Sequence, residues 1–405
     1  MQPMKFKRKD LLLAALAVEK FRDARALEPI YRFDKKRNRR VVENHRALPG
    51  RFAALDLVDG QLRLRAASPQ GKAEVRVFGE GSFGAPRDFE RLVDPGTLRR
   101  VAAEAEGEAV ELDFDGDALV VRSGNACAAT WRIETTTEGL AAFPDAEIGL
   151  ASRIGSVRTA SERFWRAVDL TDGCVGESDE RGSSPGVAVD LRQNVVFACA
   201  SSVAAICRNV GTAKDTAPTA NVSPTFLSRA RAVLNGADEL EIGLDDNFCV
   251  LTGEIGGALI QVAAPVFERM PELRRLVALR ASNPETVATA TARSALTTIT
   301  LADFVSDEKS RAVQVTFEPA ASGGGTLIAS ARSTLGRCDA ATSVEFRGER
   351  VVRWYDARRL VDFLKSVGSD ELVAFEFCAD ARRPLCVAAG DRLFFLGASQ
   401  IDYTI

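Results

Sequence analysis

A pattern that occurs three times along the 405-residue chain is the feature that most limits its fold. Each copy has a helix-like segment with a pair of arginines, then a break at glycine or acidic residues, and then strand-like segments. Leu98, Phe226 and Leu360 mark the same place in the three copies; 128 residues separate the first two and 134 the last two. These spacings are close to a third of the chain. Three similar domains are therefore predicted, each long enough to bury its own core.

Each domain is predicted to be an α+β unit in which two helices cover one face of an antiparallel sheet. The first helices are predicted at 10–21, 161–170 and 290–304, and the second at 95–104, 223–234 and 356–365. Turn residues cluster at 143–156 and 278–284, which favours linkers there. The predicted domains are residues 1–150, 151–278 and 279–405.

The chain contains a single histidine, His45, and this limits the chemistry open to it. Catalytic triads, Cys–His pairs and histidine-ligated metals all need an imidazole at the site, and His45 has polar and basic neighbours. The eight cysteines include no CxxC pair, and they lie mostly in apolar runs, which is typical of reduced, buried thiols. We expect no enzyme chemistry, no metal and no cofactor.

Two short motifs have plain structural interpretations. The segment from Gly79 to Gly84 fits GxGxxG, but Ala85-Pro86 does not open a helix after it, so a turn-rich loop is expected rather than a dinucleotide site. Asp115-Gly116-Asp117 lacks the spacing of a calcium loop and is predicted to be a hairpin turn, as is the glycine run at 323–325.

The composition indicates a soluble, cytoplasmic chain with no membrane partner. The apolar fraction is 46% and the charged fraction 27%, as in ordinary globular proteins. The apolar stretch near the N-terminus, Leu11 to Val18, is too short to span a bilayer and precedes no cleavage site of small residues.

Positive charge is concentrated near the N-terminus of an otherwise acidic chain. The net charge is −3, yet residues 5–46 hold 14 basic and 6 acidic residues, which leaves −11 for the rest. The densest run is Lys35-Lys36-Arg37-Asn38-Arg39-Arg40. Closely spaced cations bind polyanions by releasing counterions, so this run is either a phosphate-binding element or a solvated basic loop.

The repeated helix carries arginine pairs in all three copies: Arg99 and Arg100, Arg229 and Arg231, Arg358 and Arg359. A repeated cation indicates a repeated anion, such as a phosphate. The alternative is that these arginines are solvated helix formers, since arginine is abundant in this chain.

The order and spacing of several segments resemble those of the bacterial DNA polymerase III β subunit, the sliding clamp, over nearly the whole chain. The matching segments are Met4-Lys5-Phe6 with Leu11-Leu12, and residues 25–30, 58–64, 120–124, 143–145, 267–276 and 306–309. The resemblance implies a head-to-tail homodimer whose six domains form a ring around duplex DNA. It also implies a DNA polymerase and a clamp loader as partners, and phosphate contacts that do not depend on DNA sequence.

The resemblance implies a DNA-contacting role for Arg25 and points the paired helix arginines toward the hole of the ring. Residues 31–50 have no counterpart in the family, and we expect this insertion to be a loop that contacts DNA or a partner. The implied DNA-binding residues are Arg25, Lys35, Lys36, Arg37, Arg39, Arg40, Arg99, Arg100, Arg229, Arg231, Arg358 and Arg359.

Two further sites follow from the resemblance, and both depart from the family pattern. A pocket for partner peptides, between domains two and three, is expected at Cys199, Ser201, Val203, Pro271, Arg275, Leu276, Phe394 and Leu396, with its peptide specificity left open. The dimer contact is expected at Ala128, Thr130, Trp131, Phe304 and Val305. Small side chains on the strand at 128–130, which faces Phe304 and Val305, predict weak ring closure unless Trp131 compensates. The alternative is a scaffold that has kept the clamp fold and lost ring closure or DNA loading.

Overall fold

The computed structural model divides the chain into two compact units. Unit 1 is Met1–Glu162, Thr216–Pro218 and Thr225–Val266, and unit 2 is Arg163–Asp215, Thr219–Pro224 and Phe267–Ile405. The predicted domain boundaries after residues 150 and 278 stay predictions. The residues that the structure describes are 3–25, 27–34, 39–58, 61–80, 90–124, 129–143, 148, 155–176, 185–211, 219–244, 247–267, 271–307, 310–321, 323–378, 380 and 382–399.

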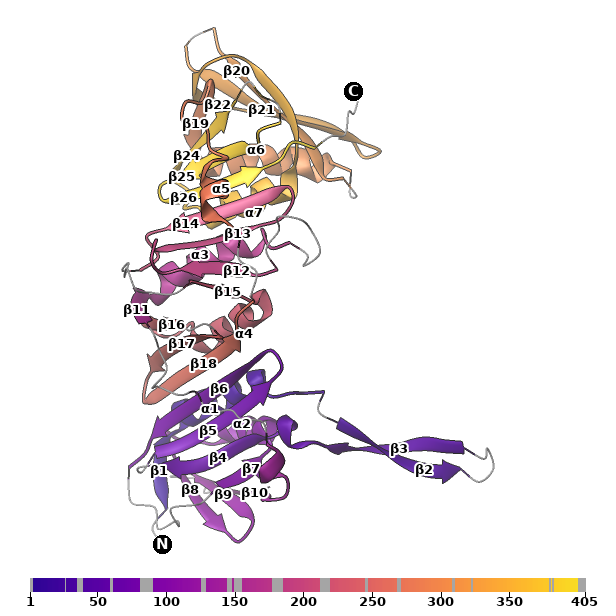
Figure 1. Ribbon diagram of the computed structural model, residues 1–405, viewed down its shortest axis with the longest axis vertical. Coiled ribbons are helices and arrows are strands. Elements are labelled where there is room, and N and C mark those ends of the chain that lie inside the picture. The colour runs from indigo at the N-terminus through magenta and orange to yellow at the C-terminus, as the bar shows by residue number, and fades with distance from the viewer. Residues whose placement is uncertain are drawn as a thin grey trace. The chain divides into compact units, whose positions relative to one another are not determined.

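Unit 1 is built on two antiparallel sheets (Figure 1). The larger has the strand order β11-β16-β17-β18-β6-β5-β4-β7 and the smaller β1-β8-β9-β10. The strands of the larger sheet are β4 (Ala53–Val58), β5 (Gln61–Ser68), β6 (Gly71–Phe78), β7 (Glu90–Val93), β11 (Gly155–Ala160), β16 (Glu239–Leu244), β17 (Phe248–Ile255) and β18 (Ala258–Pro265). Those of the smaller are β1 (Met4–Lys7), β8 (Ala109–Asp115), β9 (Ala118–Ser123) and β10 (Ala129–Glu134), and two 3-10 turns are η1 (Pro49–Arg51) and η2 (Leu140–Ala142).

The helices of unit 1 are α1 (Arg8–Phe21), α2 (Pro95–Glu104) and α4 (Pro224–Leu234). Helix α1 buries Leu11, Ala14, Val18 and other residues at helical spacing, and it contacts β5, β6, β18 and α2. Phe21, at its end, meets Phe226 of α4 edge to face, with ring centroids 6.0 Å apart.

Gly71 makes this aromatic contact possible. A Cβ atom there would lie 3.3 Å from both rings and 2.7 Å from the carbonyl oxygen of Ala263, and its φ of +151° disfavours a side chain. The two phenyl rings therefore pack directly over the start of β6.

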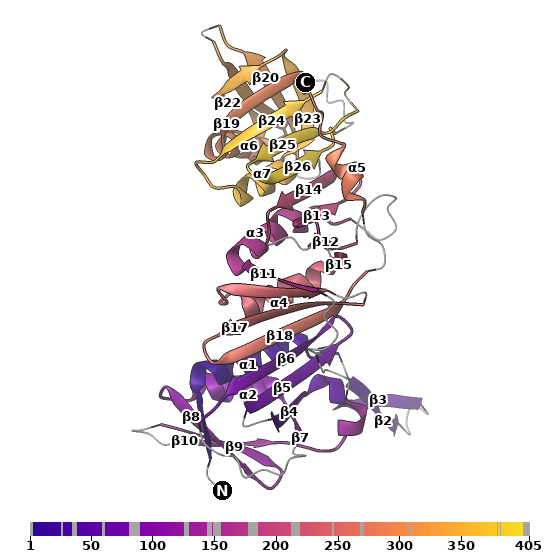
Figure 2. The same cartoon turned by 60° about the vertical axis from the view of Figure 1, so that its left-hand side comes forward.

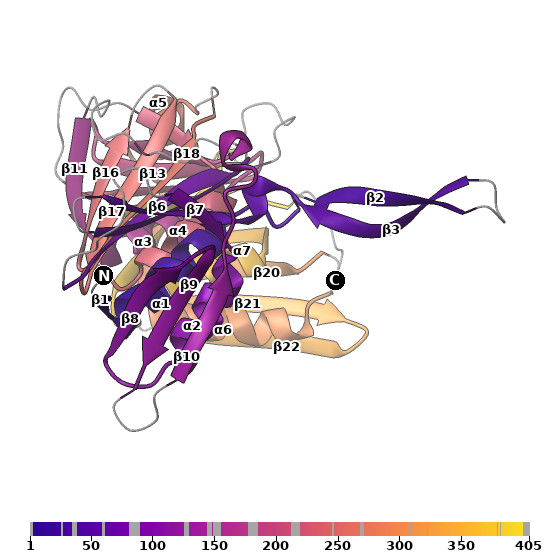
Figure 3. The same ribbon diagram turned by 90° about the horizontal axis from the view of Figure 1, so that it is seen from below.

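The insertion forms a two-stranded antiparallel hairpin of β2 (Leu27–Asp34) and β3 (Arg39–Ala47), with a bulge between Ile30 and Tyr31. Its strands pair with each other and with no other strand in the described part of the chain. Figures 1 and 3 show it as a ribbon that projects from unit 1. The expected loop is corrected here, because the run of β-branched and aromatic residues on both sides of the basic segment favours strands.

Unit 2 contains a twelve-stranded antiparallel sheet of the order β15-β12-β13-β14-β26-β25-β24-β19-β22-β21-β20-β23 (Figure 2). Its strands are β12 (Val187–Asp190), β13 (Val195–Cys199), β14 (Val203–Arg208), β15 (Thr219–Val222), β19 (Thr286–Thr291), β20 (Ala312–Pro319), β21 (Gly325–Ser333), β22 (Gly336–Arg347), β23 (Val351–Asp356), β24 (Leu372–Phe377), β25 (Leu385–Ala389) and β26 (Arg392–Leu396). The helices are α3 (Ser161–Asp172), α5 (Leu273–Val277), α6 (Ala292–Val305) and α7 (Ala357–Ser366).

Strand β26 shows that α5 and α7 cover opposite faces of this sheet. Phe394 stacks on Phe363 of α7 at 4.8 Å between centroids. Its neighbours Leu393 and Phe395 pack instead with Leu276 of α5. Successive side chains of a strand point to opposite faces, so the two helices lie on different sides.

The six helices predicted from the sequence are confirmed, with ends that shift by at most two residues. Asp94 and Asp356 start α2 and α7 as N-caps that accept backbone N–H groups, and Thr291 does the same for α6. The turn at Asp115–Asp117 joins β8 to β9 as predicted. The cysteines in the described part of the chain are free thiols. No helix among the described residues is both long and apolar enough to cross a membrane.

Candidate nucleic-acid interface and partner groove

The cations on and beside α1 and α2 of unit 1 differ in how accessible they are to a phosphate group. Arg100 of α2 is exposed, and among the described residues its side chain makes only a long hydrogen bond to Thr97 Oγ1, at 3.4 Å. Arg99 is ion-paired with Glu19 of α1, with 2.6 Å between Nε and Oε2. Arg25, in the turn after α1, is exposed. Arg25 and Arg100 are therefore better placed for a phosphate than Arg99, whose charge is already compensated.

Arg229 of α4 has a polar atom without a partner. Its Nη1 is buried and finds no hydrogen-bond acceptor among the described residues. Arg231 lies in the last turn of α4 and is partly exposed. A buried N–H without an acceptor is costly, so an oxygen that reaches Arg229 would relieve that cost.

The two arginines of α7 in unit 2 have different roles. Arg358 is 72% exposed at its side chain, with Asp362 4.0 Å away one turn later. Arg359 donates a hydrogen bond to the carbonyl oxygen of Gly173, directly after the end of α3. Carbonyls at a helix C-terminus lack intrahelical partners, so Arg359 acts as a cap for α3.

The arginine pairs do not recur at equivalent places, contrary to the sequence-based interpretation. Arg99 and Arg100 follow the capping Asp94 by five and six residues, whereas Arg358 and Arg359 follow Asp356 by two and three. A shift of about three residues on a helix of 3.6 residues per turn moves a side chain to another turn. The first and third copies thus share a helix with an aspartate N-cap, but their arginines occupy different positions along that helix.

Sequence reasoning missed Lys365, which is exposed in the last turn of α7. It follows Arg358 by seven residues, which is two helical turns, so both lie on the same face. The sequence did contain a signal for Lys365, because it lies seven residues after another cation, Arg358. Lys20 is similarly exposed in the last turn of α1.

Part of the predicted DNA-binding set lies outside the described residues. Lys35, Lys36 and Arg37 belong to it. Arg39 and Arg40 begin β3, where their backbones pair with Asp34 and Phe33 of β2. Of the densest basic run, only Arg39 and Arg40 therefore belong to the described hairpin strands.

The residues predicted for the peptide pocket do not all lie on the same face of the unit 2 sheet. Cys199 and Leu276 lie in one buried cluster on the α5 face. Phe394 lies on the α7 face, and Val203 and Leu396, which pair across β14 and β26, share its side. Of the remaining three, Ser201 and Arg275 are exposed and Pro271 is half-buried.

The α5 face carries Leu393 and Phe395 where the sequence reasoning named Phe394 and Leu396. The resemblance pointed to β26, but it did not resolve which alternate residues of that strand face which side. A shift of one residue along a strand exchanges the two faces.

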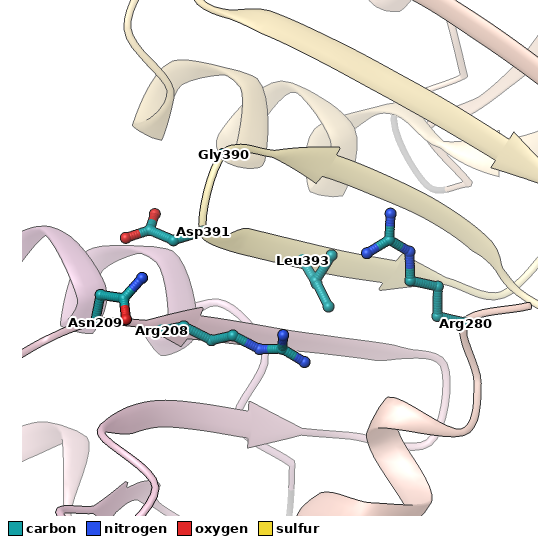
Figure 4. A pocket seen from close by; sticks show the side chains of 6 residues that line it. All are labelled: Arg208, Asn209, Arg280, Gly390, Asp391 and Leu393. Carbon is teal, nitrogen blue, oxygen red and sulfur yellow. The ribbon is translucent and has the colours of Figure 1, made fainter. Parts of the chain in front are cut away.

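Three adjoining hollows run along the α5 face of this sheet. Their volumes are about 430, 380 and 340 Å³. Arg208 lines all three, while Val277, Arg280 and Leu393 each line two. We call the combined hollow the Arg208 groove. Figure 4 shows Arg208 and Arg280 on two sides of Leu393, with Asp391 at the far end. None of the eight predicted pocket residues is among those that line it.

The charges around the Arg208 groove are only partly compensated. Arg280 makes two hydrogen bonds to Glu376, Nε to Oε2 at 2.9 Å and Nη2 to Oε1 at 2.7 Å. These hydrogen bonds raise the pKa of Arg280 above its usual value. In the described part of the chain, the side chains of Arg208 and Arg274 have neither an ion pair nor a hydrogen bond.

The predicted dimer residues lie at two exposed apolar places, one in each unit. Phe304 of α6 is 82% exposed and its neighbour Leu301 is 54% exposed, while Val305 is half-buried. In unit 1, Thr130 is exposed and Trp131 half-buried on β10, which ends its sheet and, among the described strands, pairs only with β9. Ala128 lies outside the described residues.

The described residues contain no group of three or more His, Cys, Asp or Glu side chains placed to hold a metal ion. Burial raises the pKa of Cys174, Cys207 and Cys386 to about 12. These thiols are therefore protonated at neutral pH and are poor nucleophiles.

Comparison with known proteins gives a match in structure and none in sequence. No protein-family model matches the chain, and no curated protein matches it in sequence. The DNA polymerase III β subunit of Thermotoga maritima matches with a TM-score of 0.77 and 14% identity, over 99% of this chain and 100% of that one. The DNA polymerase sliding clamp of Bacillus subtilis matches with a TM-score of 0.77 and 12% identity, over 99% of both chains.

The β sliding clamp of C. crescentus gives a TM-score of 0.73 at 15% identity, over 99% of this chain and 100% of that one. These matches run from end to end. The chain has the α+β fold of the bacterial DNA polymerase III β subunit, the sliding clamp, in a form that is highly divergent in sequence.

Proposed function

We propose that this protein is a DNA sliding clamp: a non-catalytic processivity factor that encircles duplex DNA and tethers a DNA polymerase to it. The observation that carries the proposal is the end-to-end structural likeness to bacterial sliding clamps, at TM-scores of 0.73 to 0.77. In this proposal, three domains from each of two copies close a ring, and a clamp loader places the ring on DNA.

The exposed cations support contact with a DNA backbone. Arg25, Arg100 and Arg358 are exposed on or beside helices, and Arg229 offers an unsatisfied N–H. The basic hairpin would add Arg39, Arg40 and the run before them. Such contacts are non-specific and sensitive to salt, which suits a protein that must move along DNA.

The exposed apolar residues support closure by a second copy of the chain. Phe304 exposes most of a phenyl ring on α6, and burial of such a side chain contributes roughly 1.5–3 kcal/mol. In this proposal Phe304 and Val305 of one copy meet Thr130 and Trp131 of β10 in the other. The free edge of β10 would then gain a neighbour, which removes an otherwise unpaired strand edge.

Partner proteins would dock on the α5 face of unit 2. The buried cluster that contains Cys199 and Leu276 lies there, beside the exposed Ser201 and Arg275. A polymerase or loader peptide with apolar side chains would suit the rim of this cluster. The remaining residues of the predicted set, Val203, Phe394 and Leu396, would support the sheet from its other face.

The second candidate is a clamp-derived scaffold that no longer closes or loads. It is favoured by the small and polar side chains of β10, since Thr130 offers little apolar area. The two functions differ in how the protein is held on DNA. A closed ring cannot leave DNA whose ends are blocked, whereas an open scaffold can.

The experiment is a threading assay on linear duplex DNA attached to beads at one end. The protein is added first, the free end is then blocked with streptavidin in half the samples, and all samples are washed in 0.5 M NaCl. A clamp is retained only where the end is blocked, because salt removes phosphate contacts but not a closed ring. Equal loss from blocked and open DNA contradicts the clamp and favours the scaffold.

A further inference from the structure

The β2–β3 hairpin combines aromatic and basic residues on one face, beyond its bulge. There the two strands pair in an unbroken register: Tyr31 with Val42, Arg32 with Val41, Phe33 with Arg40 and Asp34 with Arg39. Residues directly opposite each other share a face of an antiparallel pair, and alternate residues along a strand return to that face. Tyr31, Phe33 and Arg40 therefore lie on one face of the ribbon, together with Val42.

The core of unit 1 does not explain why one face carries two aromatic residues. Large aromatic side chains in the body of the unit, such as Phe6, Phe21 and Phe226, are buried. The hairpin instead projects from the unit, and among the described strands β2 and β3 pair only with each other (Figures 1 and 3). A lone two-stranded ribbon has no second layer against which to bury an apolar face. The face that carries Tyr31 and Phe33 is therefore a candidate contact surface for a ligand.

The charge of the same segment selects an anionic ligand. From Tyr31 to Val42 the sequence holds six basic residues and a single acidic one, Asp34. Arg39 and Arg40 are successive residues of β3, so each face of the ribbon carries one of them. Closely spaced cations attract a polyanion because its counterions are released, and the effect grows with the number of phosphates neutralised. A nucleic acid has this charge.

The aromatic residues favour a single strand over a duplex. Tyr31 and Phe33 are two positions apart on β2, which is about 7 Å along a strand. The bases of a duplex are stacked inside it and offer only their edges, whereas the bases of a single strand can stack on aromatic rings. Proteins that bind single strands without sequence preference combine such rings with cations that contact the phosphates. This ribbon face has both kinds of residue.

We propose that the β2–β3 hairpin binds a single-stranded nucleic acid, with bases stacked on Tyr31 and Phe33 and phosphates bound by Arg39 and Arg40. This goes beyond the proposed function, because the clamp role requires contact with duplex DNA only. Binding at the ribbon also requires no closed ring and no second copy of the chain.

The test titrates three fluorescein-labelled oligomers with the full-length protein and follows their anisotropy. The first has twelve thymidines, the second has twelve uridines, and the third has twelve propanediol units that carry the phosphates without any base. We expect the thymidine or the uridine strand to bind about tenfold more tightly than the propanediol strand, because only the first two can stack. The tighter of the two shows whether the ligand is DNA or RNA.

Tyr31→Ala combined with Phe33→Ala is expected to weaken binding of the tighter strand by about tenfold and to leave the propanediol strand unaffected. Phe33→Trp keeps a stacking surface and should retain binding, whereas Phe33→Leu keeps apolar bulk and should lose it. The matched control is Phe78→Ala, since Phe78 is a 50% exposed aromatic residue of β6 outside the hairpin. It is expected to bind like wild type.

Arg39→Gln combined with Arg40→Gln tests the phosphate contacts separately. For a single strand, each phosphate contact adds about 0.7 to the slope of log affinity against log salt concentration, so the slope should fall by about 1.4. The preference for the strand with bases over the propanediol strand should remain. Circular dichroism of each variant checks that it is folded.

Three results would overturn the proposal. They are equal binding of the propanediol strand and the strands with bases, an alanine double variant that binds like Phe78→Ala, and a 12-base-pair duplex that wild type binds as tightly as the single strand. The last result would make the hairpin a general phosphate site. The threading assay uses duplex DNA alone, so its outcome is independent of these results and the two proposals fail separately.

Discussion

At the scale of single residues, the carboxylate of Asp94 both caps helix α2 and forms an ion pair with Arg22. It accepts hydrogen bonds from the backbone N–H and the hydroxyl of Thr97, at 2.9 and 2.7 Å, and an ion pair from Arg22 at 2.7 Å. Partial burial raises the pKa of Asp94, but the hydrogen bonds from Thr97 and the charge of Arg22 outweigh it, and the pKa is lowered overall. The ionised carboxylate therefore stabilises the fold.

Replacing Asp94 with alanine is expected to lower the free energy of unfolding by about 1 kcal/mol at pH 7, the usual loss for an N-cap. Asp94→Asn keeps a capping oxygen and loses the charge, so it is expected to lose less. Because the folded pKa is below that of the unfolded chain, the stabilisation is present above about pH 4 and disappears as the pH falls through the folded value.

Urea unfolding at pH 7 and pH 3, followed by circular dichroism, measures both effects. The difference between wild type and Asp94→Asn should shrink at pH 3, where the wild-type carboxyl is protonated to a larger extent. A difference that is the same at both pH values would contradict the role of the charge.

At the scale of single elements, α7 carries residues for two roles, a proposed contact with DNA and a structural contact with α3. Arg358 and Lys365 lie on one exposed face two turns apart, while Arg359 caps α3 through the Gly173 carbonyl. Arg358→Glu with Lys365→Glu is expected to shorten the lifetime of the protein on end-blocked DNA and to reduce its salt dependence, without changing the melting temperature. Arg359→Glu is expected to lower the melting temperature by a few degrees, because the α3 carbonyl loses its donor.

Thermal melts and dissociation rates at 50 to 300 mM NaCl check these outcomes. Arg337→Glu is the matched control, since Arg337 is an exposed arginine of β22 that is outside the predicted DNA-binding set. A double variant of α7 with the control's lifetime would exclude this face from the DNA contact.

The β2–β3 hairpin is an element that the rest of unit 1 does not need. Its strands pair only with each other in the described residues. Replacing residues 28–46 by Gly-Gly is therefore expected to leave the melting temperature within about two degrees of wild type, because neither of the two larger sheets of unit 1 loses a strand. The same deletion removes seven basic and three acidic residues, so binding to a short linear duplex should weaken, most at low salt.

Anisotropy with a labelled 20-base-pair duplex measures this weakening. The control is a hairpin with Arg32, Lys35, Lys36, Arg37, Arg39, Arg40 and Arg46 changed to glutamine, which keeps the length and removes the charge. If the glutamine variant binds like wild type, the contribution of the hairpin is not electrostatic.

At the scale of the whole molecule, the proposal requires two copies. The wild-type mass in solution is expected to reach about 87 kDa, twice the 43.6 kDa of the chain, as the concentration rises. Phe304→Arg is expected to remain a monomer, because it places a charge in the apolar contact. Light scattering over a concentration series gives both masses.

The control is Leu335→Arg, since Leu335 is a 75% exposed apolar residue at the turn between β21 and β22. It should dimerise like wild type. A wild-type monomer at every concentration, or dimers in the Phe304→Arg variant, would count against closure through α6 and toward the scaffold.

The sequence by itself determined the α+β class, the threefold recurrence and the positions of the six predicted helices. These depend on local signals: the spacing of apolar residues, the capping Asp94 and Asp356, and turns such as Asp115–Asp117. A further local signal, the apolar runs around the cysteines, predicted the free thiols that the described residues show.

Only the tertiary structure decided how the side chains are used. Arg99, Arg229 and Arg359 look alike in sequence, yet one pairs with Glu19, one has an unsatisfied N–H and one caps α3. The Arg208 groove gave no sequence signal, because residues from β14, α5, β24 and β26 meet there only through sheet pairing. A local pattern fixes which residues can form an element, whereas the register between distant strands fixes which face each side chain occupies.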